Sequence, residues 1–369
     1  MKILTVIGNR PQFIKAAAVS PRLRAGDEEV LVHTGQHFDD ALSAVFFSEL
    51  GLPAPDLELG IALGSNTSQT ARMLGALEPV LHDVAPDAVL VYGDTNSTLA
   101  GALAGAQAGV PVAHVEAGMR SFDRSMPEEL NRVLVDHASA LLLCSSSVAV
   151  SNLAAEGVGG TVELVGDVMV DVALATQPQA RERVDLVELR GLEPGGYLLA
   201  TAHRAGNVDS MDRLRSLVEL LVSMPLPVLF VLHPRTRHRL DEADLLGSLE
   251  GSGRVITAPP LGYLETAALL VHARALLTDS GGLQKEAYLA GVPCVTLRAN
   301  TEWVETVEQG WNVLVDLDVS AALAAVAAFA PVEGDPPRER PPLYGDGHAG
   351  ERVVAALEHI RSAPRLGRG

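Results

Sequence analysis

The chain alternates short apolar runs with stretches of helical periodicity from one end to the other. This alternation is typical of parallel sheets covered by helices on both faces, because each parallel connection needs a crossover. The pattern loosens at residues 176–180, where we place a linker between two domains. The predicted strands are 3–8, 29–34, 88–93, 110–116, 140–144 and 161–165, and then 197–201, 228–233, 254–258, 275–278, 293–297 and 313–315.

The sequence therefore predicts an α/β protein of two doubly wound parallel-sheet domains, and 369 residues suffice for two cores. We expect an N-terminal domain over 1–175 and a C-terminal domain over 176–350. Helical patterns in the first half cover 11–24, 67–83, 96–108 and 128–138. A loop rich in Pro and Gly at 331–350 precedes a last helix at 351–362, and we assign the segment 351–369 to the first domain.

Charge and cysteine content limit the partners of the chain. The net charge of −18 argues against a nucleic-acid backbone or an anionic membrane as the main partner. No apolar run approaches the roughly 18 residues that cross a bilayer, and the first residues already have a strand pattern, which leaves no room for a signal peptide. Cys144 and Cys294 lie in apolar runs without metal-ligand spacing. We therefore expect a soluble, cytoplasmic protein without a metal site.

A strand-to-helix turn near residue 280 has the features of a phosphate site. An apolar run ends at Thr278, and Ser280, Gly281 and Gly282 open a helical stretch. Serine is a good N-cap, and the glycines let a ligand approach helix N–H groups that have no partner within the helix. Glu286 would lie about one and a half turns into the helix, within reach of sugar hydroxyls. An ordinary turn of an α/β protein fits this stretch equally well.

Other predicted strands also end in polar residues, at the edge where doubly wound sheets bind ligands. Taken singly, these residues have ordinary explanations: helix caps, acidic residues in a first helical turn, or structural histidines. Their concentration at one edge of both sheets favours a binding site. The residues are Arg10, Lys15, His37, Asp94, Glu116 and Glu128 in the first half, and His203 and His233 in the second.

The absence of several well-known motifs reduces the number of reaction classes that the chain could catalyse. The sequence lacks the glycine patterns of dinucleotide-binding and NTP-hydrolysing loops, a nucleophile elbow, and a zinc or iron–sulfur cluster pattern. What remains is a set of carboxylates, imidazoles and cations around a diphosphate site. Such a set suits acid–base chemistry with a diphosphate leaving group and no cofactor.

Six segments, in this order along the chain, resemble the non-hydrolysing branch of the UDP-N-acetylglucosamine 2-epimerase family. The resemblance extends from residue 1 to about 318 and implies a GT-B fold, in which two Rossmann-like domains hold the active site in the cleft between them. It also implies a UDP-linked 2-acetamido sugar as substrate and a homodimer. The segments are Gly8-Asn-Arg-Pro-Gln-Phe-Ile-Lys15, Thr34-Gly-Gln-His37, Tyr92-Gly-Asp-Thr-Asn-Ser-Thr98, His114-Val-Glu-Ala-Gly-Met-Arg120, Pro127-Glu-Glu-Leu-Asn-Arg132 and Asp279-Ser-Gly-Gly282.

The resemblance also implies a mechanism. In the family, UDP leaves C1 as the proton on C2 is lost, and UDP then adds back to the 2-acetamidoglucal with a proton delivered to the other face of C2. The C2 proton becomes acidic only as the C1–O bond loosens, so stabilising the departing UDP drives the step. The implied acid–base residues are Asp94, Glu116 and Glu128, and His203 lies beside the diphosphate. The implied UDP-binding residues are Arg10, Lys15, His233, Ser280, Gly281, Gly282 and Glu286.

Two departures from the family pattern bear on regulation and on the sugar. Gly206 stands where the family has a glutamate that contributes to an allosteric substrate site in some members, which argues against activation by substrate. Trp303 stands where the family commonly has an arginine. Together with 122–127 and 233–235, this change resembles a subgroup that includes epimerases of 2,3-diacetamido uronic acid sugars. A hydrolysing 2-epimerase, a GT-B glycosyltransferase and a catalytically silent nucleotide-sugar sensor are the remaining alternatives.

Overall fold

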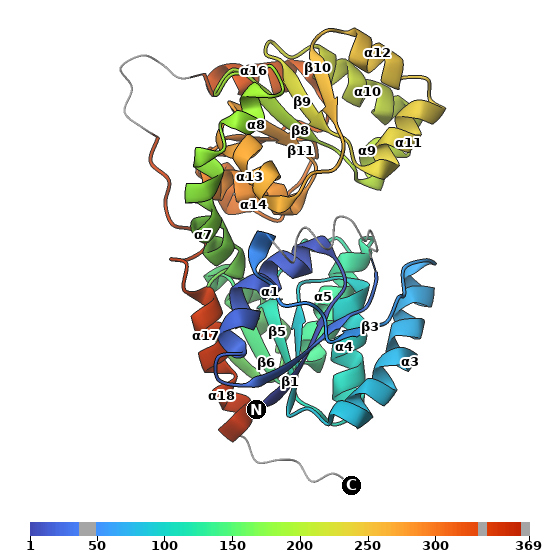
Figure 1. Cartoon of the computed structure of the whole chain (residues 1–369), viewed down its shortest axis with the longest axis vertical. Helices are drawn as coiled ribbons and strands as arrows, with labels where there is room; N and C mark the ends of the chain where they lie inside the picture. The colour runs from blue at the N-terminus through green and yellow to red at the C-terminus, as the bar shows by residue number, and fades with distance from the viewer. Residues whose placement is uncertain (37–48, 331–337, 363–369) are drawn as a thin grey trace. The chain divides into compact units, whose positions relative to one another are not determined.

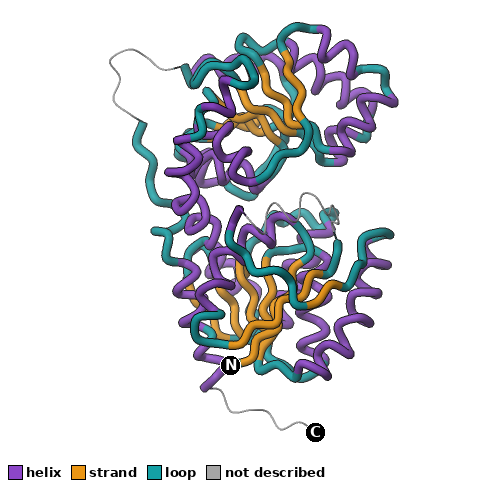
Figure 2. Tube along the Cα trace, in the orientation of Figure 1, coloured by secondary structure: helices purple, strands orange, loops and turns teal. Residues whose placement is uncertain are grey.

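The computed structural model describes residues 1–36, 49–330 and 338–362. The chain divides into two compact units: unit 1 comprises residues 1–172 and 342–369, and unit 2 comprises residues 173–341 (Figure 1). In each unit the strands form one layer with helices packed on it (Figure 2). The α/β class predicted from the alternation is confirmed. His37 lies outside the described residues.

Unit 1 is built on a seven-stranded sheet in which every described strand pair is parallel. The strand order is β3-β2-β1-β4-β5-β6-β7. The strands are β1 Lys2–Ile7, β2 Glu28–His33, β3 Leu57–Glu58, β4 Ala88–Tyr92, β5 Val112–Ala117, β6 Leu141–Cys144 and β7 Thr161–Leu164. The helices are α1 Arg10–Leu23, α3 Asn66–Val84, α4 Asn96–Gln107, α5 Pro127–Ala138, α6 Ser147–Glu156, α17 Ala349–Ala356 and α18 Glu358–Ser362, with α7 Val168–Glu182 leading out of the unit.

Unit 2 repeats this plan on a six-stranded parallel sheet of order β10-β9-β8-β11-β12-β13. The strands are β8 Leu198–Thr201, β9 Val228–Val231, β10 Val255–Ala258, β11 Ala275–Thr278, β12 Cys294–Thr296 and β13 Asn312–Leu314. The helices are α8 Asp185–Glu188, α9 Ala205–Val208, α10 Met211–Val222, α11 Pro234–Glu242, α12 Leu246–Gly251, α13 Tyr263–Val271, α14 Gly281–Ala290, α15 Val304–Glu308 and α16 Val319–Ala328.

Both sheets reverse their strand order at one point, and that point positions the candidate residues. The order turns between β1 and β4 in unit 1, and between β8 and β11 in unit 2. Such a switch point opens a crevice beyond the carboxyl ends of the strands, where ligands bind in doubly wound sheets. Arg10 and Asp94 follow β1 and β4, and His203 and Ser280 follow β8 and β11.

The helices fold as their periodicity predicts. In α3, for example, Met73, Leu77 and Leu81 recur every fourth residue and are buried against the sheet. Burying a side chain of this size contributes about 1.5–3 kcal/mol. Ser65 caps the start of α3, because its side chain accepts a hydrogen bond from the Ser68 N–H. The apolar face of the helix thus fixes its position on the sheet.

The stretch 176–180, where the sequence predicts the linker, lies inside the continuous helix α7, and the two units divide three residues before it, at 172/173. Pro178 loosens the sequence pattern, since an internal proline removes a helical hydrogen bond. Packing outweighs that loss: Ala180 is 1% exposed, and Gln177 Nε2 donates to Leu289 O at 2.6 Å. The chain therefore passes from unit 1 to unit 2 within a helix.

The C-terminal helix differs in its details from the prediction. It begins at Ala349 and is divided at Leu357 into α17 and α18. α17 packs on α1 so closely that a Cβ on Gly350 would lie 2.3 Å from Ala18 O. Asp171 accepts hydrogen bonds from the N–H groups of Ala349 and Gly350 at 3.0 and 2.8 Å. Helices α1 and α17 therefore lie side by side, although they are far apart in the sequence (Figure 1).

The described residues contain no helix that is both long enough and apolar enough to cross a membrane. Within the same residues, no three or more histidine, cysteine or carboxylate side chains come together in an arrangement that could hold a metal ion.

Candidate functional site

Helix α1, which follows strand β1, contains Arg10 and Lys15 and begins at an N-cap residue. Asn9 is the N-cap of α1, and its side chain accepts a hydrogen bond from Gln12 N at 3.2 Å. Pro11 follows in the first turn, where the lack of an N–H leaves no helical hydrogen bond unmade. Arg10 is half-buried, and the side chain of Lys15 is only 9% exposed.

Lys15 forms an ion pair with Glu116, whose side chain is also largely buried. Glu116 lies at an irregularity of β5, where the register with β6 shifts between Val115 and Ala117. Its φ of 74° lies in the left-handed region, which costs a residue other than glycine about 1–2 kcal/mol. The irregularity redirects this carboxylate out of the strand alternation. A strained backbone at a buried lysine–glutamate pair is typical of a functional site.

Asp94 is linked to this pair through Gly93, the residue before it. A Cβ on Gly93 would lie 2.9 Å from Lys15 Nζ and 3.3 Å from Glu116 Oε2. With a φ of 67° as well, the position requires glycine. Arg132 donates from Nε and Nη2 to Asp94 Oδ2 at 3.0 and 2.6 Å. Two carboxylates, each paired with a cation, therefore lie at the ends of the neighbouring strands β4 and β5.

Glu128 does not join this cluster. It is exposed in the first turn of α5, and no hydrogen bond or ion pair links it to Asp94 or Glu116 in the described part of the chain. Its neighbour Glu129 is 1% exposed and accepts hydrogen bonds from the N–H groups of Ser121 and Phe122. Burial would raise the pKa of Glu129, but these bonds and those from Arg132 outweigh it and lower that pKa.

In unit 2 the turn between β11 and α14 has the geometry expected of a phosphate site. Ser280 is the N-cap, and its Oγ accepts a hydrogen bond from Leu283 N at 3.5 Å. No acceptor among the described residues meets the N–H groups of Gly281 and Gly282, as expected for the start of a helix. A Cβ on Gly282 would meet only Ser280 Oγ, at 4.0 Å. Internal packing therefore does not require glycine at 282, which leaves room for a ligand.

Asp279 joins this turn to the end of β8. Its carboxylate is fully buried and accepts hydrogen bonds from the N–H groups of His203 and Arg204 at 3.0–3.1 Å. Asn207 Nδ2 donates to the same carboxylate at 3.1 Å. The His203 ring stacks on the His233 ring with 5.4 Å between centroids. His203, His233 and the Ser280 turn therefore form one group.

Trp303 packs against the same helix start. Its Nε1 donates to Gly281 O at 2.8 Å, and Lys285 Nζ lies 4.3 Å from the centre of its ring. Beside it, Glu302 pairs with Arg298 and Arg204. Burial would raise the pKa of Glu302, but the two guanidinium groups outweigh it and lower that pKa. Trp303 thus packs against the first turn of α14 and helps to hold it in place.

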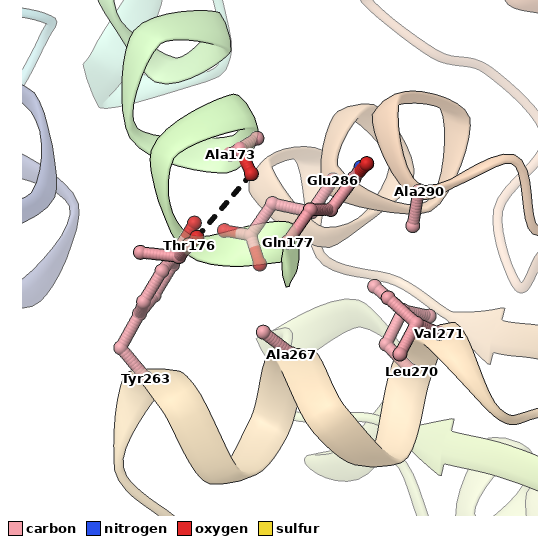
Figure 3. A pocket seen from close by; sticks show the side chains of 9 residues that line it. All are labelled: Ala173, Thr176, Gln177, Tyr263, Ala267, Leu270, Val271, Glu286 and Ala290. Carbon is pink, nitrogen blue, oxygen red and sulfur yellow. Dashed lines mark hydrogen bonds between the residues drawn. The ribbon is translucent and has the colours of Figure 1, made fainter. Parts of the chain in front are cut away.

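Glu286 lines a small cavity within unit 2. The cavity has a volume of about 20 Å³, room for about one water molecule. Figure 3 shows that its walls come from α7, α13 and α14, with Thr176, Gln177 and Tyr263 as the polar side chains beside Glu286. Glu286 lies one turn beyond Gly282 and therefore on the same side of α14.

Sequence reasoning missed the residues that support the site. Arg132, which holds Asp94, and Asp279, which holds the His203 turn, stood inside quoted motifs without an assigned role. A signal was present for Asp279, because an aspartate directly after an apolar strand becomes buried and then needs donors. For Arg132 no signal was present, because its partner lies 38 positions away in the sequence.

Comparisons with known proteins cover nearly the whole chain. The family model described as UDP-N-acetylglucosamine 2-epimerase matches residues 22–358. A Methanococcus maripaludis protein, a UDP-N-acetylglucosamine 2-epimerase homolog, is 44% identical over 98% of this chain and 100% of its own length. The UDP-2,3-diacetamido-2,3-dideoxy-D-glucuronate 2-epimerase of Pseudomonas aeruginosa is 46% identical over 98% of this chain and 100% of its own length.

Solved structures agree. The crystal structure of Methanocaldococcus jannaschii UDP-GlcNAc 2-epimerase in complex with UDP-GlcNAc and UDP has a TM-score of 0.90 and 39% identity, and the match covers 97% of this chain and 100% of that one. The Neisseria meningitidis UDP-GlcNAc 2-epimerase bound to UDP-GlcNAc has a TM-score of 0.84 and 28% identity, with 97% of this chain and 100% of that one covered. These likenesses confirm the predicted GT-B class.

Proposed function

Because the chain belongs to the UDP-N-acetylglucosamine 2-epimerase family, we propose that it interconverts UDP-N-acetylglucosamine and UDP-N-acetylmannosamine without releasing the free sugar. The family predicted from the sequence motifs is confirmed by the family model and the relatives. The observation that carries the proposal is the likeness over nearly the whole chain to an epimerase structure that holds UDP-GlcNAc and UDP.

In the proposed reaction, unit 2 holds the UDP part of the substrate. The N–H groups of Gly281 and Gly282 and the Ser280 turn would receive the diphosphate, with His203 and His233 beside it. Glu286, one turn further along α14, would accept hydrogen bonds from ribose hydroxyls. These groups stabilise the negative charge that develops on UDP as the C1–O bond breaks.

Unit 1 would carry the acid–base chemistry at C2. A carboxylate removes the C2 proton as UDP leaves, which gives the 2-acetamidoglucal, and a second group returns a proton to the other face as UDP adds back. Glu116 is our candidate for the base, because its largely buried carboxylate sits at a strained backbone position beside a cation. Asp94 follows Gly93, which packs against the same pair. We keep Glu128 as a third candidate and Arg10 as a further cation for the diphosphate.

A related sugar is the second candidate substrate. The Pseudomonas aeruginosa relative that acts on a 2,3-diacetamido glucuronate is 46% identical, and this chain has Trp303 where the family commonly has an arginine. Trp303 bonds to Gly281 O in the turn that would hold the diphosphate. The reaction at C2 is the same for both sugars, so this alternative changes the substrate and not the mechanism.

The deciding experiment follows the C2 proton. We would incubate the protein in D2O with UDP-N-acetylglucosamine and, separately, with UDP-2,3-diacetamido-2,3-dideoxyglucuronate, and record proton NMR spectra. The expected result is loss of the C2 proton signal and appearance of a UDP-linked manno product. Free N-acetylmannosamine would indicate a hydrolysing enzyme, and an unchanged C2 proton with both sugars would rule out epimerisation of either. The ratio of the two kcat/KM values decides between the sugars.

We also propose a homodimer that acts in the cytoplasm. The free, buried thiols of Cys144 and Cys294 support a reducing compartment, and the family resemblance supports the dimer. Sedimentation equilibrium tests the oligomeric state, and a mass of one chain at micromolar concentration would contradict the dimer.

A further inference from the structure

The turn that carries Asp94 is held by side chains at three consecutive carbonyl groups. Each carbonyl of Tyr92, Gly93 and Asp94 accepts a hydrogen bond from a side chain of a different part of unit 1. The donors are Gln12 Nε2 and Thr98 Oγ1 on Tyr92 O at 2.9 and 2.7 Å, His114 Nε2 on Gly93 O at 2.7 Å, and Asn131 Nδ2 on Asp94 O at 2.9 Å. These hydrogen bonds fix the backbone of residues 92–94, which includes Asp94.

The middle donor, His114, bonds through both ring nitrogens. Its Nε2 lies 2.7 Å from Gly93 O, and its Nδ1 lies 2.7 Å from Asp136 Oδ1. A carbonyl oxygen and an ionised carboxylate accept hydrogen bonds but cannot donate them. The side chain is 1% exposed, so water does not replace either partner. A ring that carries a proton on both nitrogens, an imidazolium, satisfies both acceptors.

The surroundings balance this charge. Asp136 is fully buried and also accepts hydrogen bonds from Arg120 Nη1 at 2.7 Å and from Gly118 N at 3.1 Å. Burial would raise the pKa of Asp136, but the hydrogen bonds and charges of His114 and Arg120 outweigh it and lower that pKa. Arg120 in turn pairs with Glu156 through Nε and Nη2, both at 2.8 Å.

The other titratable groups nearby do not disturb this arrangement. Burial raises the pKa of the Cys144 thiol, on the neighbouring strand β6, to about 12, so the thiol is neutral. His137 is half-exposed, and its Nε2 lies 3.9 Å from Glu156. The row His114, Asp136, Arg120 and Glu156 thus alternates positive and negative charge. An ion pair in a dry interior persists only with such partners.

We propose that His114 is a positioning residue that works as an imidazolium: it holds the Gly93 carbonyl and so fixes Asp94 beside the Lys15–Glu116 pair. This inference rests on the proposed roles of Asp94 and Glu116 in epimerisation. Gly93 packs against that pair, so a shift of its peptide would displace Asp94 or press on Glu116. A misplacement of about 1 Å costs roughly 100-fold in rate.

The protonation state can be measured without any turnover. In protein labelled with ¹⁵N-histidine, spectra near neutral pH should show one imidazolium with two bound ring protons that exchange slowly, because the ring is buried. That signal should vanish in His114→Gln and remain in His137→Gln. A His114 ring in which either nitrogen is unprotonated would be neutral and would overturn the proposal.

The positioning role is tested by kinetics. In His114→Gln, kcat should fall about 100-fold, while the KM for the UDP-sugar and the Kd for UDP stay within about threefold, because His114 bonds to none of the residues proposed to bind UDP. His137→Gln should retain wild-type kinetics. A His114→Gln enzyme with wild-type kcat would refute the role.

A second variant covers the case in which His114→Gln fails to fold. Asp136→Asn removes the counter-charge, so His114 should become neutral and kcat should fall with it; an imidazolium that persists in this variant would contradict the pairing. If the wild type proves inactive on both sugars, the NMR signal still reports on His114 and only the proposed function fails.

Discussion

Replacing Gly282 by alanine separates the fold of the α14 turn from its ligand. Gly282 is the second residue of α14, and the nearest atom to a Cβ there is Ser280 Oγ, at 4.0 Å. Alanine therefore fits without strain, and a glycine-to-alanine change at such a site stabilises a protein by about 0.4–1 kcal/mol. For a domain of this size, the gain raises the Tm by roughly 1–4 °C.

The same methyl group should weaken UDP binding. The Cα–Cβ bonds of a helix tilt toward its N-terminus, so the methyl points toward the N–H groups of Gly281 and Gly282, where a diphosphate would lie. Losing one hydrogen bond to a charged group costs about 1.5–3 kcal/mol. The Kd for UDP should therefore rise by roughly 10- to 150-fold. The variant becomes more stable as a protein and weaker as a UDP binder.

Isothermal titration with UDP and a thermal unfolding scan measure the two effects. Gly247→Ala is the matched control, because Gly247 is the second residue of α12 and a Cβ there meets no atom within 4 Å. It should raise the Tm without changing the Kd. If Gly282→Ala gained the same stability and bound UDP as tightly as the wild type, the diphosphate would not lie over this turn.

Three further changes test other parts of the site. Glu116→Gln removes the proposed base and should lower kcat by at least about 100-fold, while calorimetry still detects UDP; an active variant would exclude Glu116. Arg132→Lys loses the two-nitrogen contact to Asp94 Oδ2 and should lower kcat about tenfold or more at unchanged UDP affinity; an unchanged kcat would show that Asp94 needs no such support. Burial, partly opposed by Glu58, lowers the pKa of His33, so protons bind the unfolded chain more readily. The stability that this adds is fully present above about pH 6.5 and is lost as the pH falls through the lowered pKa. Unfolding scans from about pH 8 to about pH 5 should show this loss in the wild type and less of it in His33→Leu, and equal slopes would contradict the reasoning.

The sequence predicts those parts of the fold that repeat a local pattern. Buried parallel strands are apolar runs and their helices have a 3.6-residue period, so twelve strands of the two sheets could be placed within about two residues. β3 could not be predicted from the sequence, because it has only two residues and both are exposed. The helical structure of 176–180 could not be predicted, because Pro178 signals a break and only packing shows that the helix continues.

For the site, strand ends were the useful signal. Asp94 and Ser280 each lie two residues beyond the end of a buried strand, so topology alone brings them to the carboxyl edge of their sheets. The sequence could not show that Glu128 faces solvent while Glu129 turns inward, because helix periodicity does not fix which residue of a first turn is buried. Nor could it reveal the two acceptors of His114, which lie on other elements and meet only after folding.

Helix α17 completes the core of unit 1, although it follows unit 2 in the sequence, and this order has a consequence for biosynthesis. Val353 of α17 is fully buried, and the helix packs on α1, which leaves the ribosome long before α17. At about 5–20 residues per second, translation of residues 173–341 takes roughly 10–30 seconds. Throughout that time α1 has no partner for the face that α17 will cover. A nascent chain therefore exposes apolar surface on unit 1 until α17 has been made, and a stop codon just before Ala349 would damage unit 1 and leave unit 2 intact.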